Sequence, residues 1–337
     1  GVESYLAESA QKYLTVTLSF NRGNFTHKIG LDQVDIWRKI MLLVTGITGH
    51  TGRYFLKHLI ENNYVGKIRF AIRHTSSKEL FNNLNLNFEL AIGNLNDPLY
   101  INEIMKGVKT VFHIYNIHHS IEIIKAALKN NVQRAILVHT TGIYSQFKNA
   151  SSEYQRIESD VLSMADGKID LTILRPTMIY GDMCDRNMSK FIKMIDKMKI
   201  YPLIAGGRSL IQPVNARDLG KAYYQVLMNP EVTRNKCYNL SGERPISIQE
   251  ALTLICKYLN KKTIFIHIPL KLSVFAAYIL KYLSFCKFDI IEKVQRMGED
   301  RVFDHSLAAE DFGYSPMNFE EGIKLQIDEY LKKKAGL

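Results

Sequence analysis

The chain has 337 residues, of which 46% are hydrophobic, so it can bury a substantial core in one large domain or two. Its 44 basic residues outnumber its 33 acidic ones, and the formal net charge of +11 suits anionic ligands. No cluster of lysine and arginine interleaved with aromatic residues is present, so we predict no nucleic-acid partner. The four cysteines are widely spaced without a CxxC pair, which argues against a disulfide framework or metal site and predicts a cytoplasmic protein with reduced thiols.

Residues 1–40 differ from the rest of the chain. They lack a basic segment followed by an apolar one, so no signal peptide is predicted. The first buried strand of the fold is predicted to begin at Met41. We therefore expect residues 1–40 to form an N-terminal extension outside the core.

A glycine-rich turn, TGITGHTG, links a predicted strand to a predicted helix. Residues 41–45 form a short apolar run of mainly branched side chains, typical of a buried parallel strand, and after the turn apolar positions recur at helical spacing. Such a turn aims backbone N–H groups and the positive end of the helix dipole at one point, which suits the pyrophosphate of a dinucleotide. Gly46 permits the tight turn, Gly49 lets phosphate approach the backbone, and Gly52 lets helix and strand pack closely.

The residue after the next predicted strand indicates which dinucleotide is preferred. Residues 67–72 form that strand, and Arg73 follows where an acidic residue would bind the adenosine ribose of NAD. An arginine there favours the 2′-phosphate of NADP through charge-assisted contacts. NADP is therefore the predicted cofactor, with NAD as the alternative and an ordinary solvated arginine as the structural alternative for Arg73.

The chain then alternates predicted strands and helices. Strands are expected at residues 88–92, 110–115, 135–140 and 171–174, and helices at 121–131 and 153–164. This alternation specifies an α/β fold with a doubly wound parallel Rossmann sheet, followed by a smaller and mostly helical C-terminal substrate lobe. The predicted domains are the extension at 1–40, the NAD(P)-binding Rossmann domain at 41–185 and 212–243, and the substrate-binding lobe at 186–211 and 244–337.

The order and spacing of several short motifs carry a family resemblance. TGITGHTG at Thr45 is followed by GNLND at Gly93, VFH at Val111, TTGIY at Thr140, a tyrosine at Tyr154, LRPTMIYG at Leu174 and YNLSG at Tyr238. From Met41 to roughly Tyr330 the chain resembles extended or atypical short-chain dehydrogenases/reductases of the NAD-dependent epimerase/dehydratase type. The resemblance implies an NAD(P)-dependent oxidoreductase or epimerase with a small-molecule substrate.

The resemblance also implies a set of cofactor-binding residues. Asn94 replaces the family's usual aspartate and can accept from the adenine amino group, whereas Asp97 is expected to cap the next helix. His113 is expected at the end of a strand beside the cofactor, and no metal site is predicted for it and the nearby histidines because no carboxylate or cysteine has compatible spacing. The predicted set is Gly46, Thr48, Gly49, His50, Thr51, Gly52, Arg73, Asn94, Leu95, His113, Pro176 and Thr177.

The chemistry of the family requires three side chains. A tyrosine exchanges a proton with the substrate, a Ser or Thr hydroxyl holds the substrate oxygen, and a lysine four residues after the tyrosine lowers the tyrosine pKa. The resemblance assigns the first role to Tyr154 and the second to Thr140, with Thr141 as an alternative, but Glu158 stands in place of the lysine. Either another cation substitutes, the reaction avoids a tyrosinate base, or the chain only binds the cofactor. A plain half-buried helix residue is the structural alternative for Tyr154.

The substrate side shows a second departure from the family. Nucleotide-sugar enzymes of this type usually carry an asparagine where Met178 stands and a phosphate-binding arginine at a different position from Arg208. Arg208 is still expected to reach a diphosphate, although a surface salt bridge is the alternative. Asn187, at a predicted helix start, is expected to present N–H groups to the same diphosphate. Met178, Asn187 and Arg208 are therefore the predicted substrate-binding residues.

Residues 268–285 form the most hydrophobic stretch of the chain. It is short and is interrupted by Lys271 and Lys281, whereas a bilayer span needs about 20 apolar residues. We expect this stretch to pack against the lobe, to line an apolar substrate cleft or to form a homodimer contact. A peripheral membrane contact, with the lysines reaching the headgroups, is the less favoured alternative.

Three functions stay open. The first is an NAD(P)-dependent oxidoreductase or epimerase acting on a hydroxyl or keto group of a nucleotide-linked sugar. The second is a dehydrogenase or reductase of a lipophilic, steroid-like alcohol or ketone, favoured by Met178 and the apolar stretch. The third is a non-catalytic NADP-binding regulatory protein, favoured by Glu158.

Overall fold

The computed structural model describes residues 13–18, 25–30, 40–283 and 290–336. The chain divides into two compact units, the first comprising residues 1–137 and 160–172 and the second 138–159 and 173–337. These units are defined by contacts between residues, whereas the domain boundaries expected from the sequence were placed by motifs. Those domain boundaries stay a prediction.

Two short strands precede the predicted fold. β1 (Tyr13–Leu18) and β2 (Phe25–Gly30) pair antiparallel, with Tyr13 opposite Gly30 and Leu18 opposite Phe25. Both belong to the segment expected to be an extension. That this segment is dispensable for the core stays a prediction.

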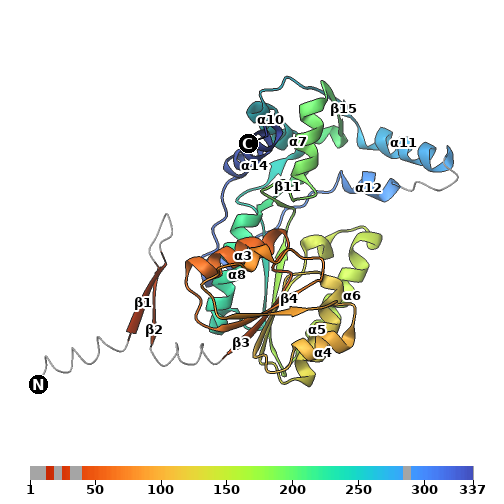
Figure 1. The fold of residues 1–337 in the computed structure, drawn as a ribbon. Coiled ribbons are helices and arrows are strands. Elements are labelled where there is room, and N and C mark those ends of the chain that lie inside the picture. Colours follow the sequence, from red (N-terminus) through yellow and green to blue (C-terminus); the bar gives the residue numbers. More distant parts are fainter. Residues whose placement is uncertain (1–12, 19–24, 31–39, 284–289, 337) are drawn as a thin grey trace, which may run out of the picture. The chain divides into compact units, whose positions relative to one another are not determined.

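A seven-stranded sheet forms the centre of the fold, in the order β13-β8-β7-β6-β3-β4-β5 (Figure 1). β3 pairs in parallel with β4 and with β6, and the pairs β4–β5 and β6–β7 are also parallel. The strands are β3 (Met41–Thr45), β4 (Lys67–Ile72), β5 (Phe88–Ile92), β6 (Thr110–His113), β7 (Arg134–Val138), β8 (Asp170–Pro176) and β13 (Lys236–Leu240). The crossover from β5 past β3 to β6 confirms the doubly wound α/β fold expected from the sequence.

Helices connect these strands as the alternation predicts. They are α3 (His50–Glu61), α4 (Pro98–Ile104), α5 (Ser120–Lys129) and α6 (Lys148–Ala165), with 3₁₀ turns η1 (Glu79–Phe81), η2 (Ile117–His119) and η3 (Thr141–Tyr144). In α3 the apolar stripe of Phe55, Leu56 and Leu59 is buried, because these positions recur on one face of the helix. Asp97 caps α4 by accepting from the N–H of Leu99, as expected.

Several element boundaries differ from the sequence expectation, and two of these differences have a local cause. β7 ends at Val138 and not at Thr140, because the Thr140 hydroxyl accepts from the N–H of Gly142 and starts η3. α6 begins five residues before the expected Glu153. The first turn of α6 is rich in polar residues. The regular spacing of apolar residues that predicts a helix is therefore absent there.

The second unit carries the remaining helices and a set of short strand pairs. Its helices are α7 (Met188–Lys197), α8 (Ala216–Met228), α9 (Pro230–Thr233), α10 (Ile248–Leu259), α11 (Leu270–Leu283), α12 (Ile291–Arg296), α13 (Ser306–Phe312) and α14 (Phe319–Lys334). The shorter pieces are β9 (Ile179–Tyr180), β10 (Ile200–Ile204), η4 (Ala205–Gly207), β11 (Leu210–Ile211), β12 (Val214–Asn215), β14 (Ile246–Ser247) and β15 (Ile264–Ile268).

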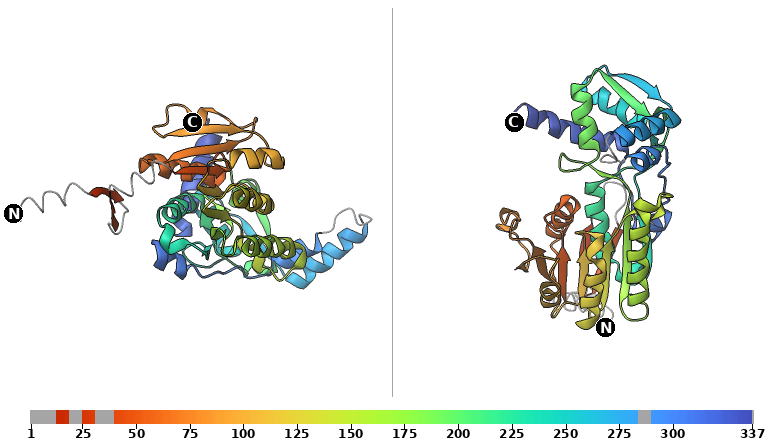
Figure 2. Two further views of the ribbon diagram at one scale, coloured as in Figure 1. Left: turned by 90° about the horizontal axis from the view of Figure 1, so that it is seen from below. Right: turned by 90° about the vertical axis from the view of Figure 1, so that its right-hand side faces the viewer.

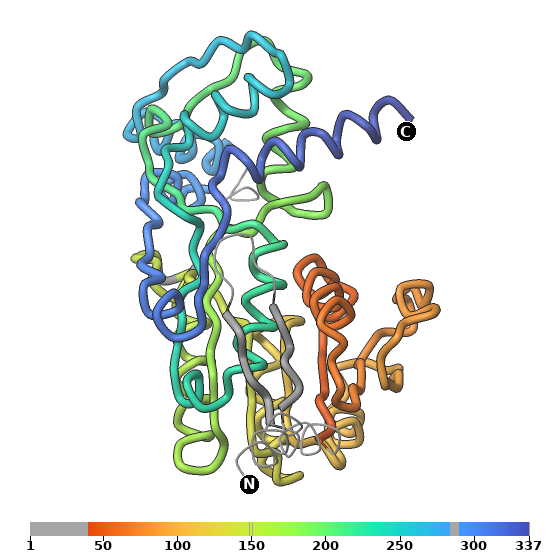
Figure 3. Tube along the Cα trace, turned by 90° about the vertical axis from the view of Figure 1, so that its left-hand side faces the viewer, coloured from red at the N-terminus to blue at the C-terminus, as the bar shows by residue number. Residues whose placement is uncertain are grey.

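One apolar core joins three helices of the second unit. Ile192 of α7, Leu252 and Ile255 of α10, and Ile323 of α14 are all fully buried in it. The blue trace in Figure 3 shows α14 running without a break toward the C-terminal end of the chain. Of the apolar stretch at 268–285, the last two residues lie outside the described part.

Candidate cofactor and substrate sites

The glycine-rich turn forms a backbone cradle between β3 and α3. Gly46 has a φ of +79°, and a Cβ on it would lie 2.7 Å from the N atom of Tyr115. A Cβ on Gly52 would lie only 2.2 Å from the carbonyl oxygen of Gly46. Gly49 precedes α3 as its N-cap, and the first turn of that helix contains no acidic residue. The turn therefore has the strand–turn–helix geometry and the positive helix end that an anionic phosphate requires.

His113 is locked into the first unit by two hydrogen bonds. Its ring is completely buried, Nδ1 lies 2.7 Å from the Thr45 hydroxyl, and Nε2 lies 2.7 Å from the carbonyl oxygen of Asn116. The carbonyl can only accept, so Nε2 carries a proton. Both ring nitrogens are engaged in this way. Within the described part of the chain, no cluster of three or more metal-ligating side chains is placed to hold an ion.

Two further predicted cofactor residues of the first unit, Arg73 and Asn94, lie just beyond the ends of strands. Arg73 follows β4 directly and is exposed, with its guanidinium carbon 5.8 Å from the centre of the Tyr115 ring. This is a cation–π contact that orients the guanidinium. Asn94 follows β5, and its side-chain carbonyl already accepts from the N–H of Asn96. Burial lowers the pKa of His119, although a hydrogen bond with the backbone of Leu95 opposes the shift.

In the second unit, Thr140 and Tyr154 meet at Gly142. A Cβ on Gly142 would lie 3.3 Å from the Thr140 hydroxyl oxygen and 3.4 Å from Cδ2 of the Tyr154 ring. The N–H of Gly142 donates to Thr140 Oγ1 over 3.0 Å, and Thr141 Oγ1 donates to the carbonyl of Pro176 over 3.2 Å. Gly142 therefore lies between the Thr140 side chain and the ring of Tyr154, and the catalytic role of both residues stays a proposal.

Glu158 is engaged in a buried charged network. Its carboxylate lies 2.9 Å from Nδ1 of His139 and accepts from both Nε and Nη2 of Arg175. Burial would raise the pKa of Glu158, but the hydrogen bonds with His139 and Arg175 outweigh it, so the pKa lies below its ordinary value. Burial would likewise lower the pKa of Arg175, whereas the bond to Glu158 raises it overall. Glu158 and Arg175 thus form a bidentate ion pair that links α6 to β8.

The same arginine reaches a tyrosine that the sequence analysis did not assign. Arg175 Nη1 donates to the Tyr144 hydroxyl over 2.7 Å, and that hydroxyl donates to Asn239 Oδ1 over 3.1 Å. The Tyr144 ring also stacks on Phe303, with 5.3 Å between ring centres. The TTGIY motif contains this tyrosine, but nothing in the sequence shows that an arginine from a later strand holds it.

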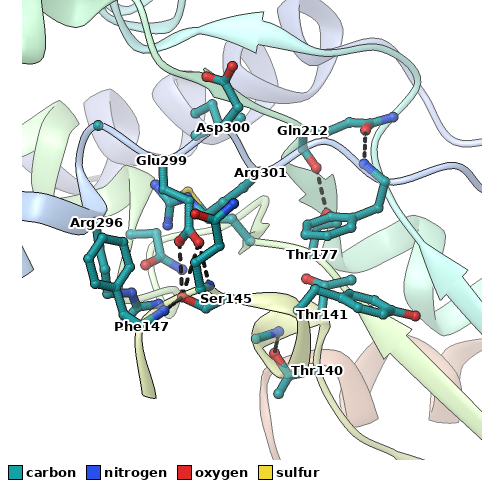
Figure 4. A pocket seen from close by; sticks show the side chains of 18 of the residues that line it. Thr140, Thr141, Ser145, Phe147, Thr177, Gln212, Arg296, Glu299, Asp300 and Arg301 are labelled. Carbon is teal, nitrogen blue, oxygen red and sulfur yellow. Dashed lines mark hydrogen bonds between the residues drawn. The ribbon is translucent and has the colours of Figure 1, made fainter. Parts of the chain in front are cut away.

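A cavity of about 790 Å³ lies within the second unit. This volume falls in the range of small-molecule sites. Figure 4 shows Thr140, Thr141 and Ser145 on one part of its wall, with Arg296 and Arg301 nearby. The predicted site residues that line it are Thr140, Thr141, Thr177, Met178 and Asn187. Tyr154, Pro176 and Arg208 are absent from its lining, and Arg208 is exposed.

Two arginines in the cavity wall were missed by the sequence analysis. The Nε atoms of Arg296 and Arg301 are buried and have no hydrogen-bond partner among the described residues. Burial, with the neighbouring charge of Arg296, lowers the pKa of Arg301 from its ordinary value. Two buried Nε donors of this kind suit an anion that would satisfy them. Their sequence context, QRMGEDR, does not distinguish them from surface residues.

The carboxylates beside these arginines already have other partners. Glu299 accepts from the Ser145 hydroxyl at 3.0 and 3.2 Å and from the N–H of Gln146 at 2.8 Å (Figure 4). Asp300 Oδ1 accepts from the N–H of Leu210 over 2.8 Å. The two acids therefore fix the loops around the cavity, and neither makes a hydrogen bond to the Nε atoms of the arginines.

The fold and the glycine cradle define a Rossmann protein of the NAD(P)-dependent epimerase/dehydratase type. The family model of NmrA-like proteins matches residues 38–331, and the chain belongs to this NmrA-like family. A UDP-glucose 4-epimerase of Vibrio cholerae is 23% identical over 327 residues, which cover 86% of this chain and 95% of the relative.

Solved structures of sugar-nucleotide enzymes share the fold. The UDP-glucose 4-epimerase of Thermotoga maritima with UDP-glucose has a TM-score of 0.66 at 17% identity, covering 88% of this chain and 100% of that one. A double mutant of the dTDP-glucose 4,6-dehydratase DesIV from Streptomyces venezuelae, with NAD bound, has a TM-score of 0.63 at 16% identity, covering 88% and 98%. The family match begins at residue 38, close to the predicted first strand.

Proposed function

We propose that the protein is an NADP-dependent oxidoreductase or epimerase that acts on a hydroxyl or keto group of a nucleotide-linked sugar. The observation that carries this proposal is the cavity of the second unit, which combines threonine hydroxyls with two arginines whose buried Nε atoms have no hydrogen-bond partner among the described residues. The hydroxyls suit a sugar oxygen, and the guanidiniums suit the diphosphate of a nucleotide sugar. The relatives named above act on UDP-glucose and dTDP-glucose, which supports this substrate class.

The first unit supplies the residues that would hold the dinucleotide. At Gly46 and Gly52 a Cβ would clash with nearby backbone atoms. Such close backbone packing is expected at a glycine turn that binds a pyrophosphate. Arg73 stands where NAD-binding proteins have an acidic residue. It therefore favours the 2′-phosphate of NADP over the free ribose hydroxyl of NAD. When bound, the dinucleotide supplies a nicotinamide ring that accepts or donates a hydride.

The residues of the chain orient the substrate and move its proton. Tyr154 exchanges a proton with the substrate oxygen, while Thr140 or Thr141 holds that oxygen by a hydrogen bond. Arg296 and Arg301 bind the diphosphate and so fix the sugar relative to these hydroxyls. Asn187, at the N-terminus of α7, lines the same cavity and adds a polar contact. A cytoplasmic location and a homodimer stay predictions.

Two other functions are each favoured by one observation. Met178 and Leu270 line the cavity with apolar surface, which favours a lipophilic alcohol or ketone as substrate. The Glu158–Arg175 pair in place of the usual lysine favours a regulatory protein that binds NADP without turnover. Both alternatives keep the dinucleotide and differ only in what the second unit binds.

A panel of nucleotide sugars and lipophilic ketones, assayed with NADPH and NADP, separates these functions. For the first function, Arg301→Ala raises the KM for the nucleotide sugar about tenfold to a hundredfold, because a charged hydrogen bond contributes roughly 1.5–3 kcal/mol. The matched control Arg208→Ala, outside the cavity lining, leaves KM unchanged, and neither substitution changes the Kd of NADPH. Equal effects of the two substitutions contradict the assignment of the diphosphate site. Tight NADPH binding without turnover on any substrate supports the regulatory protein instead.

A further inference from the structure

Helix α11 has an unusual distribution of apolar side chains. One stripe, containing Leu270, Val274 and Ala277, packs against Ile291 and Val294 of α12 and the chain next to it. Figures 1 and 2 show the two helices projecting together from the second unit. A helix covered on only one stripe normally carries polar residues on the others.

The uncovered faces of α11 are apolar as well. The Phe275 side chain is 62% exposed and that of Tyr282 is 84% exposed. The exposed large apolar residues of the helix are Leu272, Phe275, Tyr278, Ile279, Leu280, Tyr282 and Leu283. Such a contiguous surface marks an interaction site and not ordinary solvent exposure. Nearby, Ile264 and Ile266 of β15 are also more than half exposed.

The charges around this surface indicate what covers it. Residues 251–288 contain six lysines and no Asp, Glu or Arg. Lys257 pairs with Glu320 and Lys261 with Asp196, so these two are partly compensated within the same unit. Lys271 and Lys281 lie on α11 itself, among the exposed aromatic and aliphatic side chains. Basic residues beside exposed tyrosine, phenylalanine and leucine are typical of a helix that lies in the interface of an anionic membrane.

We propose that α11 docks the protein on an anionic phospholipid surface, with its apolar faces in the interfacial region and its lysines at the headgroups. Tyrosine side chains favour this depth because their rings are apolar and their hydroxyls remain hydrated. With 14 residues the helix is short for a membrane span, and no helix in the described part of the chain is long and apolar enough to cross one. Leu270, the first residue of α11, also lines the cavity, so docking would place the substrate site close to the lipid.

Co-sedimentation of the full-length chain with vesicles tests this proposal. One vesicle preparation contains phosphatidylcholine alone and the other contains phosphatidylcholine with phosphatidylserine. We expect binding to the anionic vesicles, weakened by added salt, and at least about tenfold weaker binding by a Phe275→Ser, Tyr282→Ser double variant, because each aromatic side chain contributes apolar area. Lys271→Glu lowers binding to the anionic vesicles about fivefold and leaves neutral vesicles unaffected.

The control substitution is Leu99→Ser in the first unit, where the leucine on α4 is 80% exposed. It removes exposed apolar area elsewhere and should bind vesicles as the wild type does. Unchanged melting temperatures show that all variants are folded. Equal binding of the wild type and the double variant overturns the proposal, as does equal binding to both vesicle preparations. A third outcome is that neither protein binds vesicles, while the wild type is a dimer and the double variant is a monomer. That result would show that a second copy of the chain covers α11. None of these readouts requires dinucleotide binding or turnover.

Discussion

The ion pair between Glu158 and Arg175 should be a major determinant of the stability of the second unit. The Glu158 side chain is 6% exposed and that of Arg175 is 14% exposed, so removal of one charge leaves the other poorly hydrated. Breaking a buried ion pair by removing one partner costs about 3–5 kcal/mol. Glu158→Gln keeps the volume and one acceptor, so we expect a loss near 3 kcal/mol in the free energy of unfolding. For a chain of this size that corresponds to a fall in Tm of about 4 °C.

A matched set of variants isolates the pair. Glu153→Gln removes an exposed carboxylate from the same helix and should change the free energy of unfolding by less than about 0.5 kcal/mol. The double variant Glu158→Gln, Arg175→Met removes both charges and should be more stable than the sum of the two single effects. Denaturant unfolding measures the wild type and the four variants, Glu153→Gln, Glu158→Gln, Arg175→Met and the double variant. A Glu158→Gln protein as stable as Glu153→Gln refutes the argument.

The stability of this pair should depend on pH in a defined direction. The folded pKa of Glu158 lies below its ordinary value of 4.5, because the hydrogen bonds outweigh the burial. Its contribution is therefore fully present above pH 4.5 and is lost as the pH falls through the folded pKa. The Tm difference between the wild type and Glu158→Gln should stay constant near neutral pH and narrow in acid. A difference that grows in acid would contradict the direction of the shift.

Four further measurements test the cofactor, the chemistry, the extension and a second buried acid. NADPH should bind more tightly than NADH, and Arg73→Asp should reverse that order in a fluorescence titration; equal affinities in the wild type would remove the argument. Tyr154→Phe should lower kcat by orders of magnitude with little change in the Kd of NADPH, and full activity would exclude it as the proton donor or acceptor. A chain that begins at Met41 should fold and bind NADPH, whereas insolubility would place the leading segment in the core. Burial raises the pKa of Asp218 to about 6, so the folded protein loses stability as pH rises from 3.8 to 6, and Asp218→Asn should raise Tm at pH 7 but not at pH 4.

The parallel sheet could be predicted because parallel strands leave strong local signals. Each expected strand is a short apolar run, and the glycine turn between Thr45 and Thr51 fixes one strand-to-helix connection. The element ends were less predictable. β7 stops early because the Thr140 side chain competes for a backbone N–H, and such capping depends on a single rotamer and not on a periodic pattern.

The candidate site was predictable only where the residues share a motif. Thr140, Thr141 and Thr177 belong to the TTGIY and LRPTMIYG motifs and line the cavity, while their roles stay predictions. Arg296 and Arg301 were missed, since their burial depends on how a C-terminal segment folds over the cavity and no local pattern records this. The exposure of α11 could not be predicted from the sequence either, because the apolar pattern of a helix does not show whether its outer face is covered.

The structure gives the exchange of lysine for Glu158 a physical explanation. A lysine at this position of α6 would place a cation near the hydroxyl residues, and here β8 brings a cation to the same region through Arg175. The guanidinium is held by Glu158 on one side and donates to Tyr144, a tyrosine in the cavity wall, on the other. The acid at position 158 therefore positions a cation and does not merely remove one, so a lysine introduced there would oppose Arg175 and would not restore the usual tyrosine–lysine pair.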